Sequence, residues 1–396
     1  MGTYYDKKRP RYRSGSGRRL RRMRRRGRPI SGRRGGPLLI VFLVLLFVAA
    51  LAAAVVFLIV PMFQGTYDGT APEVVAAEPL PTEAPHTVQV VELGALQKEV
   101  ALSDRYVNSP WVADGAMVLV GGTDDYGNPA MRSMYLLDLG GEESEPTRLS
   151  LSPENDEFFH VRMNERWIVY CDGNSDEGGT VMAYERATGE TLRVKDYYAG
   201  APELALDGDT LCFMERTGTY MDKLYVCDLN TLECVAVATF EESVYGQSEP
   251  SAANGQLIWA DGGTDGGSVI CSLDLETGEL GSFDAGTYVH DPVTNGTDWA
   301  WIDSNHEAGA KLYLSVAGGE PQVLAENVLN YGISEEFVAY DKDGAIYVYF
   351  IEDGYEQIIT PAAERGWLAC VANGTVLWYE TGVSSSRDLL KYAVID

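Results

Sequence analysis

Few side chains in this sequence have the types and spacing that catalysis or metal binding requires. Its 396 residues include four histidines, which stand in four different segments, and no two have the spacing of metal ligands. His290 precedes Asp291 and His306 precedes Glu307, so either pair could supply a general base from a loop. Surface histidines beside acids are the alternative. Since the sequence also contains no nucleophile elbow, phosphate loop or dinucleotide fingerprint, we expect a protein that is not an enzyme.

One acidic segment resembles the start of a calcium-binding loop. Asp172, Asn174 and Asp176 stand at alternate positions, as oxygen ligands of calcium loops do. The later positions do not fit, because Gly178 stands one position too late and Ala183 replaces the expected bidentate glutamate. We therefore expect no cofactor, with calcium at these three residues as the one candidate. Ordinary turn chemistry of Asp and Gly is the alternative.

Aromatic residues form the candidate ligand-binding set. They recur, with one histidine, in the segments that join repeated units of the chain: Tyr197, Tyr198, Tyr245, Tyr288, His290, Tyr331 and Trp367. If they converge around one opening, they form an aromatic platform suited to a sugar, a peptide or a cationic ligand. The alternative is that each ring packs over the sheet beside it.

Two of the six cysteines have the spacing of a cross-strand pair. Cys227 and Cys234 flank the turn at residues 229–232 symmetrically, so we expect them to face each other across a hairpin. A disulfide there is possible in an oxidising compartment, although so short a loop adds little stability. The other four, Cys171, Cys212, Cys271 and Cys370, are typical of small buried apolar residues.

The elements that position these residues follow a repeat. Two-residue turns recur at 114–115, 164–165, 207–208, 254–255, 295–296, 334–335 and 373–374, and five of these seven are Asp-Gly or Asn-Gly. Such dipeptides tolerate the positive φ angles of tight hairpins. An apolar strand follows each turn, and a strand rich in Leu and Tyr comes next. The repeat therefore predicts four-stranded antiparallel units rather than helices.

Seven such units predict an all-β protein, a seven-bladed β-propeller, with six or eight blades as the alternatives. The last unit, which ends at Asp396, lacks a fourth strand. A strand at Thr87 to Leu93 or at Lys98 to Ser103 precedes the first unit. We expect that strand to complete the last blade, because closing the ring removes an open sheet edge.

The loops between the second and third strands of these units are acidic. Their carboxylates belong to Asp124, Asp125, Asp172, Asp176, Asp222, Asp261, Asp303 and Asp341, among others. In a propeller these loops share one face with the segments that join successive blades. The sequence therefore predicts one acidic face.

The order of turn, apolar strand, Leu-Tyr strand, Asp-Leu and Thr-Gly-Glu resembles the repeat of TolB-like and related PD40-type β-propellers. The resemblance covers the chain from Ser109 onward. The Pro-Asp-Gly turn that is frequent in that family is replaced here by bare Asn-Gly or Asp-Gly. The resemblance implies the fold, and it transfers no functional residue.

The charge is divided unequally along the chain. Residues 1–37 carry 15 Lys and Arg against one Asp, a net charge of +14, and the remainder carries −41. Residues 38–63 contain no charged side chain, so they are long enough and apolar enough for one transmembrane helix. A cleaved secretory signal is the alternative. Basic residues stay on the cytoplasmic side, which predicts a single-pass protein of the cell membrane with its C-terminal domain outside the cytoplasm.

These patterns define four regions. Residues 1–37 form a basic, disordered cytoplasmic tail, 38–63 the transmembrane helix, 64–85 a Pro-rich stalk and 86–396 the propeller. The tail would contact the lipid bilayer through anionic headgroups, and nucleic acid is not the expected partner. We expect an extracytoplasmic binding, sensing or scaffold module whose partner is an envelope ligand or protein. The alternative is a hydrolase or lyase that acts on polysaccharide in the propeller funnel.

Overall fold

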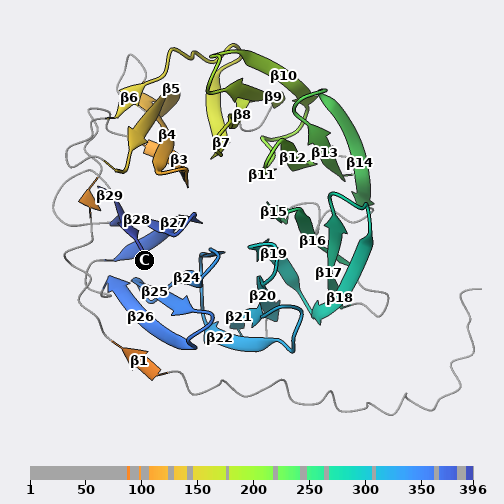
Figure 1. Ribbon diagram of the computed structural model, residues 1–396, viewed down its shortest axis with the longest axis vertical. Coiled ribbons are helices and arrows are strands. Elements are labelled where there is room, and N and C mark those ends of the chain that lie inside the picture. Colours follow the sequence, from red (N-terminus) through yellow and green to blue (C-terminus); the bar gives the residue numbers. More distant parts are fainter. Residues whose placement is uncertain are drawn as a thin grey trace, which may run out of the picture. The chain divides into compact units, whose positions relative to one another are not determined.

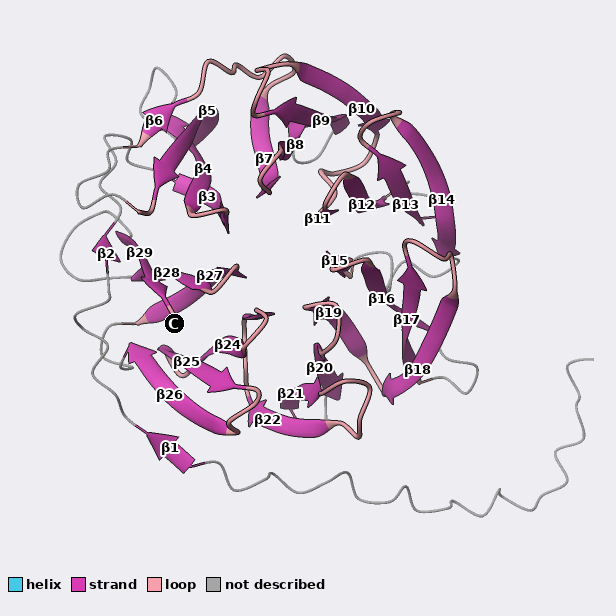
Figure 2. Cartoon of the chain, in the orientation of Figure 1, coloured by secondary structure: helices cyan, strands magenta, loops and turns pink. Residues whose placement is uncertain are grey.

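The computed structural model describes only β-strands and the turns and loops between them (Figure 2). The described residues are 87–89, 98–99, 107–123, 129–140, 146–174, 178–216, 222–240, 248–262, 267–305, 309–360, 365–380 and 389–395. All of them belong to one compact unit, residues 79–396. Over these ranges no helix is long and apolar enough to cross a membrane. The predicted tail, transmembrane helix and stalk at 1–37, 38–63 and 64–85 lie outside the described residues.

Seven sheets are arranged as the blades of a ring, which confirms the predicted seven-bladed propeller (Figure 1). Blade one contains β3 (Val107–Ala113), β4 (Ala116–Thr123), β5 (Pro129–Asp138) and β6 (Thr147–Arg148). Blade two contains β7 (Glu157–Met163), β8 (Trp167–Asn174), β9 (Gly178–Glu185) and β10 (Thr191–Tyr197). Blade three contains β11 (Leu204–Asp207), β12 (Thr210–Glu215), β13 (Asp222–Asp228) and β14 (Glu233–Phe240).

The other four blades repeat this order from the centre of the ring outward. Blade four contains β15 (Ser251–Ala253), β16 (Gln256–Gly262), β17 (Ser268–Asp274) and β18 (Leu280–Gly286). Blade five contains β19 (Val289–Thr294), β20 (Trp299–Asn305), β21 (Gly309–Ser315) and β22 (Gln322–Glu326). Blade six contains β23 (Tyr331–Ile333), β24 (Phe337–Lys342), β25 (Ala345–Phe350) and β26 (Tyr355–Thr360). Blade seven contains β27 (Gly366–Ala372), β28 (Thr375–Glu380) and β29 (Leu389–Val394).

The ring closes through N-terminal strands. β2 (Lys98–Glu99) pairs antiparallel with β29 and supplies the fourth strand of blade seven, as one of the two sequence alternatives proposed. The other alternative, β1 (Thr87–Gln89), instead pairs parallel with β26 and extends blade six to five strands. The N-terminal segment therefore covers the outer edges of two neighbouring blades.

The core lies between blades rather than in one centre. The second strand of each blade is buried on both faces, so alternate side chains pack against opposite neighbours. In β8, Trp167 and Val169 face blade three, whereas Ile168 and Tyr170 face blade one. One such cluster joins blade seven to blade one through Leu377, Tyr392, Met117 and Leu119. Apolar packing therefore continues across the seam where the chain begins and ends its ring.

The predicted hairpin turns also join neighbouring blades. Asn254, Asn295 and Asn373 each donate from Nδ2 to a backbone carbonyl of the next blade, over 2.8 to 3.1 Å. The Asn373 bond reaches the carbonyl oxygen of Val112 and crosses the seam at 2.9 Å. Asn254 and Asn373 have φ of 48° and 47°, and a glycine with positive φ follows each. These asparagines thus fix both the hairpin and the contact between blades.

Candidate functional site

The inner strands of the seven blades surround the centre of the ring (Figure 1), and the residues that face this centre line a channel. Its cavity has a volume of about 910 Å³ and is lined by residues of all seven inner strands or of the segments that lead into them. The wall is mixed in character: Trp111, Leu329 and Leu368 are apolar, and Arg162, Glu249 and Asp291 carry charge. A channel of this size admits a side chain or a small ligand.

An equivalent position recurs where each blade enters its inner strand. This position lies four residues before the residue that directly precedes the two-residue turn between the first and second strands of the blade. In blade order it is occupied by Ser109, His160, Glu203, Glu249, Asp291, Asn330 and Leu368. Ser109, His160 and Asp291 have positive φ, and the pairing register shifts there. This bulge re-aims side chains at the channel mouth. Charged groups fill the position in blades two to five.

The groups at this position in blades two and three contact each other. His160 Nδ1 forms an ion pair with the Glu203 carboxylate, and Arg162 lies 3.4 Å from the other oxygen of that carboxylate. The Arg162 guanidinium also stacks over the Trp111 ring at 4.4 Å. Burial acts to raise the pKa of Glu203, but His160 and Arg162 outweigh it, so the pKa lies below its ordinary value. Glu203 is therefore an ionised and fully partnered carboxylate.

Each carboxylate oxygen of Asp291 has one partner. Its Oδ1 accepts the N–H of Glu249 at 2.8 Å, and its Oδ2 lies 2.9 Å from His290 Nδ1. The other ring nitrogen of His290 bonds Ser304 Oγ at 2.8 Å. The hydrogen bond to Asp291 raises the pKa of His290 against the opposing effect of burial. Both nitrogens of His290 are thus engaged, and this residue orients Asp291.

Glu249 differs from its neighbours. No donor among the described side chains or backbone groups bonds its carboxylate, and the side chain is open to the channel. The side chain is exposed, and the protein around the channel together with the charges of Glu203 and Asp291 raises the pKa of Glu249 above its ordinary value, against the weaker effects of Arg162 and Arg216. Glu249 is therefore an exposed carboxyl group that lies near two other acids and has no hydrogen-bond donor among the described residues.

The aromatic residues predicted as a platform are divided by the structure. Tyr197 is only 2% exposed and packs between blades two and three, whereas the adjacent Tyr198 is 73% exposed. Tyr288 and Trp367 are also exposed. Tyr331 lines the channel, and its hydroxyl donates to the carbonyl oxygens of Asp291 and His290. Tyr245 lies outside the described residues.

The exposed members share one face of the propeller. Tyr198, Tyr288 and Leu329 lie where the chain passes from an outer strand to the next inner strand, and Trp367 is the second residue of the inner strand β27; Leu329 is 77% exposed. These four residues are called the apolar rim below. They lie on the face where Glu249 enters the channel. The rim includes three of the sequence candidates, and Leu329 was not among them.

Several carboxylates of the hairpin loops on the predicted acidic face are buried and hydrogen-bonded. Asp172 is 1% exposed, and its oxygens accept the N–H groups of Glu154 and Asn155 at 2.7 and 3.0 Å. Asp303 accepts the N–H groups of Thr287 and Tyr288 at 3.1 and 2.8 Å. Asp341 accepts those of Asn330 and Leu368, at 3.0 and 2.9 Å. These aspartates are not solvated, because each one anchors a segment that joins two blades.

The calcium candidates fall in this same hairpin. The oxygens of Asp172 are occupied by the backbone donors of Glu154 and Asn155, Asn174 is half-buried, and Asp176 lies outside the described residues. Within the described ranges, no group of three or more His, Cys, Asp or Glu side chains is arranged to hold a metal ion.

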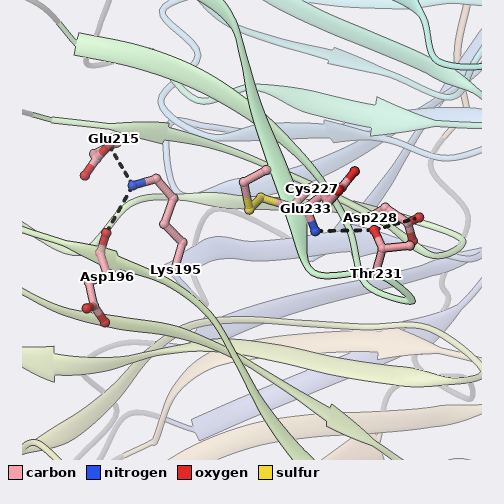
Figure 3. Close-up of a disulfide and its surroundings, with 8 residues drawn as sticks. Lys195, Asp196, Glu215, Cys227, Asp228, Thr231 and Glu233 are labelled. Carbon is pink, nitrogen blue, oxygen red and sulfur yellow. Dashed lines mark hydrogen bonds and ion pairs between the residues drawn. A yellow bond between two sulfur atoms is a disulfide. The ribbon is translucent and has the colours of Figure 1, made fainter.

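Cys227 and Cys234 form a disulfide between β13 and β14, where they pair directly in the sheet (Figure 3). In the adjoining turn, Glu233 N–H donates to Thr231 Oγ1, which in turn donates to Asp228. On the neighbouring blade, Lys195 bonds Glu215 at 3.3 Å and lies over the Tyr225 ring. The disulfide thus lies in a well-ordered outer hairpin, away from the channel-lining strands.

Sequence reasoning missed Arg162, Glu203 and Glu249. The sequence carried only a weak signal, because Glu203 stands four residues before the turn at 207–208 and Glu249 five residues before the turn at 254–255. Their common register appears only when the structure defines the turns, which lie at 208–209 and 254–255. Their charges alone, among so many acidic residues, gave no reason to select them.

No family model matches the chain, and no curated protein matches it in sequence. Among solved structures, the β-propeller domain of the Trilobed protease from Pyrococcus furiosus is similar, with a TM-score of 0.56, 12% identity and coverage of 73% of this chain and 96% of that chain. The acylaminoacyl peptidase of Pyrococcus horikoshii has a TM-score of 0.55 and 11% identity, over 74% of this chain and 52% of that chain. The match therefore spans about half of the peptidase.

TolB from Acinetobacter baumannii is also similar, with a TM-score of 0.45, 12% identity and coverage of 61% of this chain and 62% of that chain. The likenesses to the two Pyrococcus proteins, together with the seven sheets, confirm the β-propeller fold that the resemblance to TolB-like and PD40-type propellers implied. They transfer no residue and no activity.

Proposed function

We propose that this protein is a membrane-anchored, extracytoplasmic binding module that captures an envelope protein on the apolar rim and at the channel mouth. The observation that carries the proposal is the placement of Tyr198, Tyr288, Leu329 and Trp367, which are exposed on the face where Glu249 enters the channel, with Leu329 lining the channel itself. Exposed aromatic and apolar residues around a polar centre are typical of recognition surfaces. Both carboxylate oxygens of Asp291 and both ring nitrogens of His290 already have hydrogen-bond partners, which favours a preformed surface rather than a proton-transfer pair.

The proposed cellular location and membrane topology of the module rest on the sequence. The uncharged residues 38–63 and the +14 charge before them support a single pass with residues 1–37 in the cytoplasm, where they contact anionic headgroups. The Cys227–Cys234 disulfide supports an oxidising location for the propeller. Protease added to intact spheroplasts should digest the propeller and spare an epitope tag at residue 1. Digestion of the tag with protection of the propeller would reverse this topology.

Capture of a partner tests the binding function. Full-length protein in detergent should retain an envelope protein, and the double variant Tyr198→Ala/Trp367→Ala should lose most of it. The matched control is Val235→Ala/Leu280→Ala, which removes two equally exposed apolar side chains from outer strands. Equal retention by both double variants, or retention of nothing by the wild type, would remove the proposal.

An activity on polysaccharide is the second candidate. It is favoured by one observation: Glu249 and Asp291 line the same cavity, and the pKa of Glu249 is raised, as a general acid requires. Wild-type protein should then release new reducing ends or unsaturated products from envelope polysaccharide, and Glu249→Gln should release none. If the wild type also releases none from any fraction, this candidate fails.

A further inference from the structure

Within the part of the channel mouth that the structure describes, the Glu249 carboxyl has no hydrogen-bond donor. Glu203 is paired with His160 and Arg162, and both oxygens of Asp291 have donors. Glu249 lies between these two carboxylates in the order of the blades, and its backbone N–H donates a hydrogen bond to Asp291 Oδ1. Its carboxylate accepts no hydrogen bond from any described residue and opens into the channel. Any ligand that enters from this face meets that carboxylate.

The geometry points to Glu249 as the receptor for a cationic side chain, a lysine ammonium or an arginine guanidinium, on a protein that docks at the apolar rim. This inference rests on the proposed function and names the chemistry of its partner. A cation at Glu249 relieves its repulsion with Glu203 and Asp291 and gains a charge-assisted hydrogen bond. An anion would meet three carboxylates there.

The apolar rim selects a protein partner rather than a free polyamine. Tyr198, Tyr288, Leu329 and Trp367 lie on the same face as Glu249, so a peptide can place apolar side chains on the rim and one cationic side chain in the channel. Lysine and arginine also have long apolar stems, which suit a channel wall containing Leu329 and Leu368. A polyamine would use the carboxylate but gain little from the rim.

A matched pair of probes tests the site in the full-length protein. N-acetyl-arginine methylamide and N-acetyl-citrulline methylamide have the same shape and differ in charge. Isothermal titration at low salt should detect the arginine probe, and the citrulline probe should bind at least about tenfold more weakly. Because the interaction is ionic and partly solvated, affinity for the arginine probe should fall as salt is raised. Equal binding of the two probes would overturn the inference.

The residue is tested by a matched pair of variants. Glu249→Gln should weaken binding of the arginine probe at least about tenfold, whereas Glu276→Gln, which changes an exposed carboxylate in the outer turn between β17 and β18 of the same blade, should not. Loss of binding in both variants, or in neither, would contradict the assignment to Glu249. Spermidine serves as the arm for a free polyamine. If Trp367→Ala weakens an arginine peptide and spermidine equally, the rim plays no part in selection.

A measurement on the wild type covers the case in which Glu249→Gln does not fold. Glu203, Asp291, Arg162 and Arg216 are the charged groups that act on Glu249, and its pKa is raised among them. A bound cation favours the ionised form, so binding near neutral pH should release protons, and affinity should rise with pH. Titrations in buffers of different ionisation enthalpy count those protons. Absence of proton release would contradict the site.

The outcome for the site is separate from that for the proposed function. If the arginine probe binds but no envelope protein is captured, the proposed function fails and the site stands. If an envelope protein is captured and Glu249→Gln changes neither its retention nor probe binding, the site fails and the function stands.

Discussion

The buried aspartates of the hairpin loops and Glu249 of the channel belong to the same face of the propeller but have opposite surroundings. Asp172 and Asp341 are 1% and 2% exposed, and each accepts hydrogen bonds from at least two backbone N–H groups. Glu249 accepts none from the described residues and faces the channel. The buried carboxylates are therefore structural, and the open carboxylate is the one with binding capacity left.

This difference shows that the number of donors around a carboxylate, rather than the density of acidic residues, separates anchoring from binding. Asp291 illustrates the point. It occupies the same repeat position as Glu249, but each of its carboxylate oxygens has a partner, Glu249 N–H for one and His290 for the other. The two residues are both acidic, so a surface map of negative charge would not distinguish them. Their hydrogen bonds do distinguish them.

The largest effect should come from removing a buried anchor. Asp341→Ala leaves the N–H groups of Asn330 and Leu368 without their acceptor inside the protein. We expect a loss of about 3 kcal/mol in the free energy of unfolding, measured by urea denaturation with tryptophan fluorescence. Asp353→Ala, in an exposed turn of the same blade, is the control and should change stability by less than about 0.5 kcal/mol. Similar values for the two variants would show that burial of Asp341 is unimportant.

A smaller loss should follow from removing the disulfide. Cys227 and Cys234 are separated by only seven residues, so the bond restricts the unfolded chain by less than a long loop would. Cys227→Ala/Cys234→Ala should cost roughly 2 kcal/mol and should leave binding of the arginine probe unchanged. Thermal unfolding with and without dithiothreitol measures the first value. A large loss of probe affinity would mean that the outer hairpin controls the channel, and it would contradict the assignment of binding to Glu249.

The smallest effect concerns His290, which orients the Asp291 carboxylate. Its pKa is raised by the hydrogen bond to Asp291, against the opposing effect of burial. The stability that this pair contributes is present in full below the unfolded pKa of about 6.5 and is lost as pH rises through the raised pKa. Replacing His290 by Asn should therefore make stability less dependent on pH from about 6 to 8. If the variant and the wild type keep the same pH profile, His290 is not the group that titrates.

Much of the fold could be predicted from local signals. The Asp-Gly and Asn-Gly turns and the alternating apolar strands determine hairpins, and their spacing implies seven blades. The parallel addition of β1 to blade six could not be predicted, because three residues carry no periodicity and the partner strand lies more than two hundred residues away. Pairing so distant depends on the finished ring.

The candidate site was predictable only in part. Tyr197 and Tyr198 are adjacent, and successive side chains of an extended chain point to opposite sides, so sequence could not decide which of them is exposed. Glu249 could not be separated from the other acidic residues, because its role depends on donors that reach Glu203 and Asp291 but not Glu249 itself. Those donors come from other blades or from bulges that local patterns do not specify.

Titration of the Glu249 carboxyl by carbon NMR, with the signal assigned from Glu249→Gln, tests the central claim most directly. In the free protein the pKa of Glu249 should lie well above the ordinary value of about 4.3, and saturating N-acetyl-arginine methylamide should lower it. The citrulline probe should leave it unchanged. An ordinary pKa that does not respond to the arginine probe would show that Glu249 is one more solvated acid and that the channel has no cationic site.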